Sequence, residues 1–226
     1  MNAVIYCSNT GECAKIAKYL ADKCGYIALD LCAVESFVFD TAVLVFPVHC
    51  QNIPSAVKDF LSKLQVKDLA VVAAYGKMSY GNVLYEVQKG YRHKIVAAAY
   101  VPTKHAYLAE EGFENFSKLD PIVEKLKTPA PVKIPKSRKN PFANFMPAAR
   151  SRAGVKLYAD GNCNNCGLCS GVCGRGAINC GKPNNKCIRC LKCVENCPRS
   201  ALHFTLRAPM RAYLKNYEKN KLIIYI

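Results

Sequence analysis

Residues 163–198 read CNNCGLCSGVCGRGAINCGKPNNKCIRCLKCVENCP and contain the same cysteine spacing twice. Each copy follows the pattern C-x2-C-x2-C-x3-C. The first copy is Cys163, Cys166, Cys169 and Cys173, and the second is Cys187, Cys190, Cys193 and Cys197. Three thiolates placed three residues apart wrap around one face of a cubane, so the pattern predicts a pair of iron–sulfur clusters.

The similarity between the two copies continues past the cysteines. Residues 176–178 (Gly-Ala-Ile) follow the first copy as residues 200–202 (Ser-Ala-Leu) follow the second, which predicts a module with two similar halves. Structural zinc is the main alternative, but zinc sites usually join two C-x2-C pairs over a longer spacer, and a third cysteine so near would crowd a tetrahedral ion. A disulfide framework is less favoured still, because fourteen cysteines without a secretory leader are typical of a reducing compartment.

The cysteine-rich segment, about residues 155–204, resembles a bacterial-type two-cluster ferredoxin, including Pro198 after the last cysteine. The resemblance implies a small α+β domain over residues 155–206 that holds two [4Fe-4S] clusters. It also implies that the last cysteine of each copy completes the cluster of the other copy. One cluster would be held by Cys163, Cys166, Cys169 and Cys197, and the other by Cys187, Cys190, Cys193 and Cys173. Gly174 stands where the family usually has proline, which shapes a turn there and binds nothing.

The charge of the chain is distributed unevenly. The net charge is +16, yet residues 1–126 carry 13 Lys+Arg and 13 Asp+Glu, whereas residues 127–226 carry 19 and 3. A basic, proline-containing linker is therefore expected over residues 128–154, between a domain at 1–127 and the cluster domain, with a basic tail at 207–226. This basic half is either a solvated surface or a docking surface for an acidic partner. Nucleic acid is not favoured, because no recognition motif accompanies the basic residues.

The first 127 residues alternate between apolar runs and segments of helical periodicity. Helices are expected from residue 13 to 20, at 54–64, at 81–89 and before residue 127, and the segment between the second and third strands has room only for a turn. The strands are expected at 3–7, 26–31, 42–48, 69–75 and 94–101. This alternation predicts an α/β domain with a doubly wound five-stranded parallel sheet, in which ligands bind at the carboxyl ends of the strands.

The loop after the first strand has the composition of a phosphate site. It offers two hydroxyls, an amide, a glycine and the amino end of a helix, and these groups suit a phosphate without a cationic side chain. The candidate residues are Ser8, Asn9, Thr10, Gly11, Glu12 and Cys13. Neither a Walker loop nor a dinucleotide fingerprint is present, so ATP and NAD(P) have no visible site. An ordinary turn that caps a helix is the alternative interpretation.

This loop resembles the [S/T]-x-T-G-x-T loop of flavodoxin, in which it binds the phosphate of FMN, and Cys13 replaces the last threonine. The resemblance covers residues 1–127 and implies that the loops after the third and fourth strands grip the isoalloxazine ring. In these two loops the candidate ring contacts are Pro47, Val48, His49, Cys50, Tyr75, Gly76, Tyr80 and Gly81. Tyr75 or Tyr80 would stack on the ring. With no Trp in the chain, His49 would be the flat residue of its loop, unless it is an ordinary loop histidine.

Both halves together resemble the flavodoxin–ferredoxin fusion proteins of anaerobic microbes. This resemblance implies an electron-transfer protein that passes electrons between FMN, two [4Fe-4S] clusters and a redox partner, which the basic half suggests is acidic. A flavin-dependent reductase of a small molecule and a redox sensor remain alternatives. Without a leader or a long apolar run, we expect a soluble, cytoplasmic protein with no membrane span. The apolar end at 222–226 packs on a neighbouring surface, forms an edge strand or makes a subunit contact, which leaves a homodimer open.

Overall fold

A computed structural model describes residues 1–108, 112–215 and 221–226. The chain folds as two compact units. Unit 1 consists of Met1–Pro141 together with Glu218–Ile226, and unit 2 consists of Phe142–Tyr217. Within the described residues, no helix has both the length and the apolar character needed to cross a membrane.

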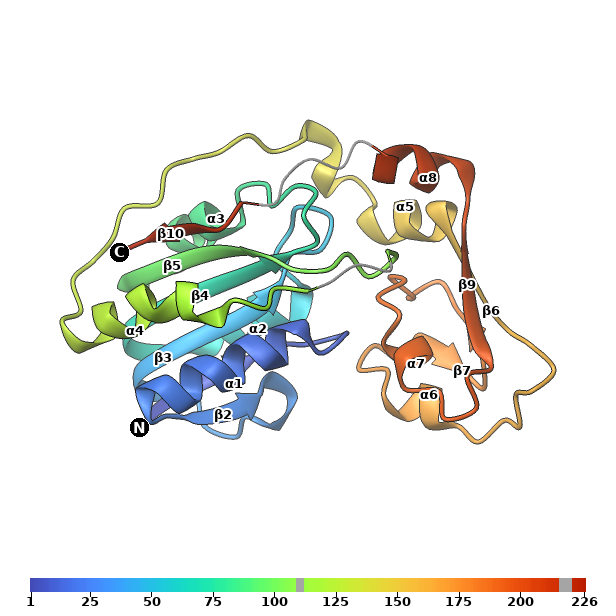
Figure 1. Ribbon diagram of the computed structural model, residues 1–226, viewed down its shortest axis with the longest axis horizontal. Coiled ribbons are helices and arrows are strands. Elements are labelled where there is room, and N and C mark those ends of the chain that lie inside the picture. The colour runs from blue at the N-terminus through green and yellow to red at the C-terminus, as the bar shows by residue number, and fades with distance from the viewer. Residues whose placement is uncertain (109–111, 216–220) are drawn as a thin grey trace. The chain divides into compact units, whose positions relative to one another are not determined.

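Unit 1 is built on a mostly parallel six-stranded sheet in the order β10-β5-β4-β3-β1-β2 (Figure 1). Its strands are β1 (Asn2–Tyr6), β2 (Ile27–Asp30), β3 (Val38–Pro47), β4 (Gln65–Tyr75), β5 (Ile95–Pro102) and β10 (Ile223–Tyr225). The strand order reverses direction between β1 and β3, which places a topological switch point between their carboxyl ends. β10 runs antiparallel to its neighbour β5, with which it pairs.

Helices cover both faces of this sheet. α2 and α3 lie on one face, and α1 and α4 lie on the other. The helices of unit 1 are α1 (Glu12–Cys24), α2 (Ser55–Lys63), α3 (Val83–Gly90) and α4 (Asp120–Lys127), with short 3-10 turns at η1 (Leu31–Ala33) and η2 (Phe116–Leu119). Central strands buried on both faces explain why their sequences are continuous apolar runs rather than alternating ones.

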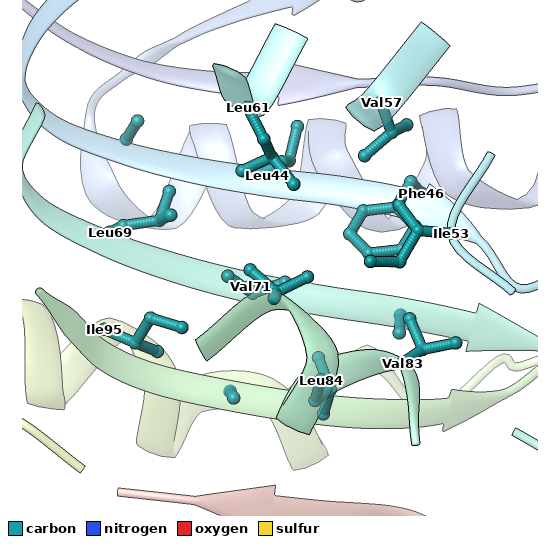
Figure 2. Close-up of a cluster of buried hydrophobic side chains, with 14 of the residues drawn as sticks. Leu44, Phe46, Ile53, Val57, Leu61, Leu69, Val71, Val83, Leu84 and Ile95 are labelled. Carbon is teal, nitrogen blue, oxygen red and sulfur yellow. The ribbon is translucent and has the colours of Figure 1, made fainter. Parts of the chain in front are cut away.

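Two hydrophobic clusters hold the layers of unit 1 together. Figure 2 shows the cluster on the α2 and α3 face, where Val57 and Leu61 of α2 lie over Leu44 and Phe46 of β3. Leu44 is completely buried, and burying a side chain of this size stabilises the fold by roughly 1.5–3 kcal/mol. The packed sheet therefore holds in place the carboxyl ends of its strands, from which the loops begin.

The five predicted parallel strands are all present, and the short segment between the second and third strands is indeed reduced to the turn η1. The prediction of a five-stranded sheet was incomplete, because the chain end adds β10 as a sixth strand. Residues 223–225 pair in antiparallel register with Ala98, Ala99 and Tyr100. This result selects the edge-strand alternative for the apolar chain end, and it removes the open edge that β5 would otherwise present.

The structure divides the predicted linker at 128–154 between the two units. Residues 128–141 run along unit 1, where Ile134 is 2% exposed and the Val132 N–H donates to the Ile95 carbonyl at 2.9 Å. These apolar residues bury against the sheet layer although charged residues surround them in sequence. Unit 2 begins at Phe142, and the predicted tail divides in the same way, since α8 (Ala208–Lys215) belongs to unit 2 and β10 to unit 1.

Unit 2 contains two small antiparallel pairs of strands and several short helices. β6 and β9 pair from Val155↔Leu206 to Ala159↔Leu202, and β7 and β8 form a tight hairpin. The remaining bounds are η3 (Pro141–Asn144), α5 (Pro147–Gly154), β6 (Val155–Ala159), α6 (Leu168–Gly171), β7 (Ile178–Asn179), β8 (Lys182–Pro183), α7 (Lys192–Glu195) and β9 (Leu202–Leu206). The cysteine-containing segment connects β6 to β9, so the pairing of these two strands brings its two ends together.

Candidate cofactor sites

The two cysteine copies of unit 2 adopt matching backbone conformations at a spacing of 24 residues. The residue before the second cysteine has positive φ in both copies, at 57° for Asn165 and 59° for Arg189. The residue after that cysteine also has positive φ, at 78° for Gly167 and 63° for Leu191, and it caps α6 or α7. A left-handed conformation costs a branched residue such as Leu191 about 1–2 kcal/mol, so the surrounding structure must hold it in place.

Backbone N–H groups point at cysteine sulfurs in corresponding positions of the repeat. The Ala177 N–H donates to Cys173 Sγ and the Ala201 N–H donates to Cys197 Sγ, each at 3.3 Å. Burial raises the pKa of Cys197, but the backbone N–H groups around its sulfur outweigh this effect, and the pKa is lowered from its ordinary value. Such donors favour the thiolate, which is the form that binds iron.

The first predicted set of four cysteines lines a single cavity. Cys163, Cys166 and Cys169 come from the first copy, whereas Cys197 comes from the end of the second copy. The fold thus brings the distant Cys197 to the same cavity as the other three cysteines. Cys180, at the tip of the β7–β8 hairpin, lines the same cavity although the sequence did not suggest a role for it.

The second predicted set is more deeply enclosed. Cys187 and Cys193 are buried, whereas Cys166 of the first set is exposed. Burial raises the pKa of Cys193 to about 12, and the neighbouring Cys190, Cys187 and Cys173 thiols act in the same direction. Across the described residues, no three or more His, Cys, Asp or Glu side chains form a site for a single metal ion.

The predicted phosphate loop of unit 1 lies between β1 and α1. Gly11 caps α1 with a φ of 86°, a left-handed conformation that suits glycine, and no side-chain cap to this helix is found among the described residues. The hydroxyl of Ser8 is buried and has no hydrogen-bond partner in the described part of the chain. An unsatisfied buried hydroxyl beside a helix amino end fits an anionic ligand such as a phosphate, and Asn9 and Thr10 complete the same turn.

The last two residues of this loop have other contacts. The Cys13 side chain is 3% exposed and lies in the hydrophobic cluster under α1, so its thiol does not replace the threonine hydroxyl of the flavodoxin loop. The Glu12 carboxylate is buried, accepts a hydrogen bond from Lys15 Nζ at 3.0 Å and lies against the backbone of Gly112. The contribution of both residues to a phosphate site is therefore restricted to their backbone N–H groups.

The predicted second loop is a tight turn that follows β3. Val48 extends the β3–β4 pairing through its N–H, while His49 and Asn52 exchange two backbone hydrogen bonds of 3.0 and 2.9 Å. Between them, Cys50 and Gln51 both have positive φ, at 51° and 64°. Two consecutive left-handed residues without glycine cost about 1–2 kcal/mol each, and strain of this kind is typical of functional loops.

The predicted third loop, residues 75–81, meets the second loop directly. A Cβ on Gly81 would lie 2.8 Å from the Cβ of Gln51, so only glycine permits this approach. A Cβ on Gly76 would meet the ring of His105 at 2.8 Å, which brings the loop after β5 to the same place. The structure therefore joins the two predicted ring-contacting loops, as expected from their positions at the carboxyl ends of adjacent strands.

Of the two tyrosines expected to stack on the ring, Tyr75 does not present an exposed ring face. Tyr75 is 2% exposed, and its hydroxyl donates to the Lys221 carbonyl at 2.7 Å. Its position at the end of a central strand covered on both faces explains this burial. Tyr80 is half-buried and stacks on Tyr100, with ring centroids 4.0 Å apart. One face of the Tyr80 ring is therefore already occupied.

The sequence did not identify the residues that tie the two loops to the basic segment. Ser137, Lys139 and Asn140 make hydrogen bonds to Asn82, Asn52 and Gln51. The apolar pair Val132 and Ile134, spaced as alternating positions of an extended segment, is the one signal that this stretch lies on the domain.

Comparison with known proteins adds little. No family model matches the chain, and no curated protein matches it. One similar solved structure is the Trp repressor binding protein from Bacillus subtilis, with 14% identity and a TM-score of 0.31 over 55% of this chain and 93% of that chain.

Proposed function

We propose that this chain is an electron-transfer protein that combines a flavodoxin-like FMN unit with a ferredoxin-like unit holding two [4Fe-4S] clusters. When bound, FMN exchanges one or two electrons and each cluster exchanges one. The observation that carries the proposal is the cavity lined by Cys163, Cys166, Cys169 and Cys197, which matches the predicted cluster-binding set across the two copies.

The residues of unit 2 fit this role chemically. Eight cysteines occur in two copies of one backbone conformation, and N–H groups at equivalent positions donate to the sulfurs. Hydrogen bonds to the sulfurs and exposure to solvent are two means by which a protein sets cluster potential. The exposed Cys166 and the buried Cys187 and Cys193 predict that the two clusters have different potentials and that the first cluster is nearer to solvent.

The FMN phosphate is assigned to the loop from Ser8 to Glu12, and the isoalloxazine ring to the turn at residues 49–52 and the loop at residues 75–81. The buried Ser8 hydroxyl and the helix amino end supply donors for the phosphate. His49 remains the candidate flat residue at the ring. In this assignment the chain binds, orients and shields the cofactor, while the redox chemistry belongs to the flavin.

The redox partner is proposed to be an acidic protein. Unit 2 carries 12 Lys+Arg and 2 Asp+Glu between residues 142 and 217. Eight thiolates and two 2+ cluster cores add about −4, so the unit keeps a net charge of about +6. A basic surface of this kind steers an acidic partner, and electron transfer to it should slow as ionic strength rises. The compartment that fits this chemistry is a reducing cytoplasm.

Two cysteines that line the same cavity provide the test. Cys197→Ala should remove the first cluster and lower the iron content of anaerobically purified protein from about eight to about four atoms. Cys180→Ala, the matched control, should retain all the iron. Equal iron content in the two variants would contradict the assignment of Cys197, and protein that holds both clusters but no flavin would contradict the assignment of unit 1.

A further inference from the structure

We propose that residues 137–140 form a clamp that fixes both ring-contacting loops, with Ser137 and Lys139 as positioning residues for the isoalloxazine ring. The inference rests on the proposal that unit 1 holds FMN. It assigns a role in flavin binding to a basic segment whose sequence indicates only a linker. The role concerns the geometry of the two loops and not a direct reaction with the flavin.

Lys139 holds the second loop to helix α3. Its Nζ donates to Asn52 Oδ1 at 2.8 Å and to Glu86 Oε1 at 2.6 Å. The lysine side chain is 13% exposed, unusually low for a residue in a basic segment. Because the ammonium group is largely removed from water, its two acceptors must remain in place, and the turn that carries Asn52 is fixed to α3.

Ser137 and Asn140 complete the clamp. The Ser137 N–H donates to Asn82 Oδ1 at 2.6 Å, and the Ser137 hydroxyl donates to the Gly81 carbonyl in the third loop. The Asn140 N–H donates to Gln51 Oε1 at 2.9 Å. Three residues within four positions of the segment thus reach both loops, the second through the side chains of Gln51 and Asn52 and the third through the Gly81 carbonyl.

The second loop needs this support because its conformation is strained. Cys50 and Gln51 both occupy the left-handed region, and the turn contacts Gly81 at a distance that allows no side chain there. A strained turn relaxes unless its surroundings over-determine it. Loops held in the bound conformation lose less entropy when a ligand arrives, so the clamp should increase affinity for the ring portion of the flavin.

The phosphate loop provides an internal contrast. Its donors come from Ser8 and from the amino end of α1, which packs on the opposite face of the sheet from α3. The clamp should therefore change binding of the ring and leave binding of the phosphate group unaltered. Riboflavin shares the ring with FMN and lacks the phosphate, which allows the two contributions to be separated.

The experiment titrates flavin-free, full-length protein with FMN and with riboflavin. Lys139→Met and Ser137→Ala should each raise the dissociation constants of both flavins by a similar factor of about ten, the effect of losing one buried hydrogen bond to a charged or backbone group. Lys136→Met removes an equal charge from an exposed position of the same segment and should change neither constant. The midpoint potentials of bound FMN should shift in the first two variants and stay at the wild-type values in the third.

The outcomes separate the clamp from the function on which it rests. Wild-type protein that binds neither flavin would overturn the FMN assignment itself. If wild-type protein binds FMN and the Ser137 and Lys139 variants retain its affinity and potentials, the clamp is wrong. A loss of FMN affinity without any change in potentials or in riboflavin binding would also overturn it, because the effect would then lie at the phosphate. Ser137→Ala keeps the charge of the site and removes a single hydroxyl group, so it decides the question if Lys139→Met does not fold.

Discussion

The two units of the chain are stabilised in different ways. Unit 1 has continuous hydrophobic clusters on both faces of its sheet, with fully buried large side chains such as Phe46, Leu44 and Leu84. In the part of the chain that the structure describes, unit 2 buries fewer apolar side chains, and none of them belongs to the two hydrophobic clusters. Its buried apolar side chains among the described residues are Ala143, Val155, Leu157, Ala177, Ile178, Cys187, Leu191, Cys193, Ala201, Leu202 and Leu214. Unit 1 therefore specifies its own fold, whereas unit 2 is expected to depend on what its cysteines bind.

Removing iron should produce the largest difference between the units. Anaerobic treatment of the full chain with an iron chelator should abolish amide-exchange protection across residues 163–197, because the proposed clusters supply much of the folding free energy there. Strands β3 and β4 should stay protected, since apolar burial holds them. Hydrogen exchange followed by mass spectrometry measures both regions in one sample. Simultaneous loss of protection in both units would show that the stability of unit 1 depends on unit 2.

Leu44→Ala tests the opposite side of the comparison. Leu44 lies at the centre of unit 1 and is completely buried, so the substitution should lower the free energy of unfolding of unit 1 by about 2–5 kcal/mol. Denaturant unfolding followed by circular dichroism measures this change. Val38→Ala, on the same strand but 60% exposed, should have little effect. Iron content should stay unchanged in both variants, and a loss of iron from Leu44→Ala would contradict the independence of unit 2.

The same difference explains what the sequence could predict. In unit 1, apolar runs predict strands correctly because central parallel strands are buried on both faces. Because the run is apolar throughout, it does not show which side chains point into the core, and the burial of Tyr75 could not be predicted from it. In unit 2, cysteine spacing predicts which residues gather, and the cavity containing Cys197 agrees with it. It does not predict that Leu191 takes the left-handed conformation that Gly167 takes, because tertiary contacts impose that conformation.

Two segments have positions that local sequence does not determine, and they share one physical cause. Residues 128–141 and the chain end both gain their structure from partners far away in sequence, as in the pairs Val132 with Ile95 and Tyr225 with Ala98. From local composition alone, residues 128–141 are expected to form a basic linker, and the structure of the chain end is not determined. Antiparallel addition of a strand to a sheet edge depends on which edge is available, and this is a property of the folded unit and not of the segment.

Tyr75→Phe tests whether the chain end is an integral part of unit 1. The Tyr75 hydroxyl donates to the Lys221 carbonyl at 2.7 Å and accepts from the Lys221 N–H at 3.1 Å. Its removal leaves two backbone groups without this partner and should cost about 1–3 kcal/mol. Amide exchange of residues 223–225 should accelerate, while exchange in unit 2 should not change. Unchanged exchange at β10 would mean that strand pairing alone holds the chain end.

Two peripheral pairs give the units opposite responses to pH. In unit 1, the Tyr19 hydroxyl donates to Asp120 Oδ1 at 2.5 Å, and this hydrogen bond raises the pKa of Tyr19 to about 12. In unit 2, the hydrogen bond between His203 Nε2 and Asp160 Oδ2, at 2.8 Å, holds the pKa of Asp160 below its ordinary value. A raised pKa stabilises the folded state at pH values below the unfolded pKa, and a lowered pKa does so above it.

The smallest predicted effect follows from these signs. The Tyr19 contribution should be complete below about pH 10 and lost as the pH rises toward about 12, so Tyr19→Phe should flatten the alkaline fall in the stability of unit 1. The Asp160 contribution should be complete above about pH 4 and lost at lower pH, so Asp160→Asn should flatten the acid fall of unit 2 alone. Both pairs lie at the surface, where solvent weakens such interactions. Amide exchange read separately for each unit at each pH checks the assignment, and a change in the opposite unit would show that stability is shared across the two.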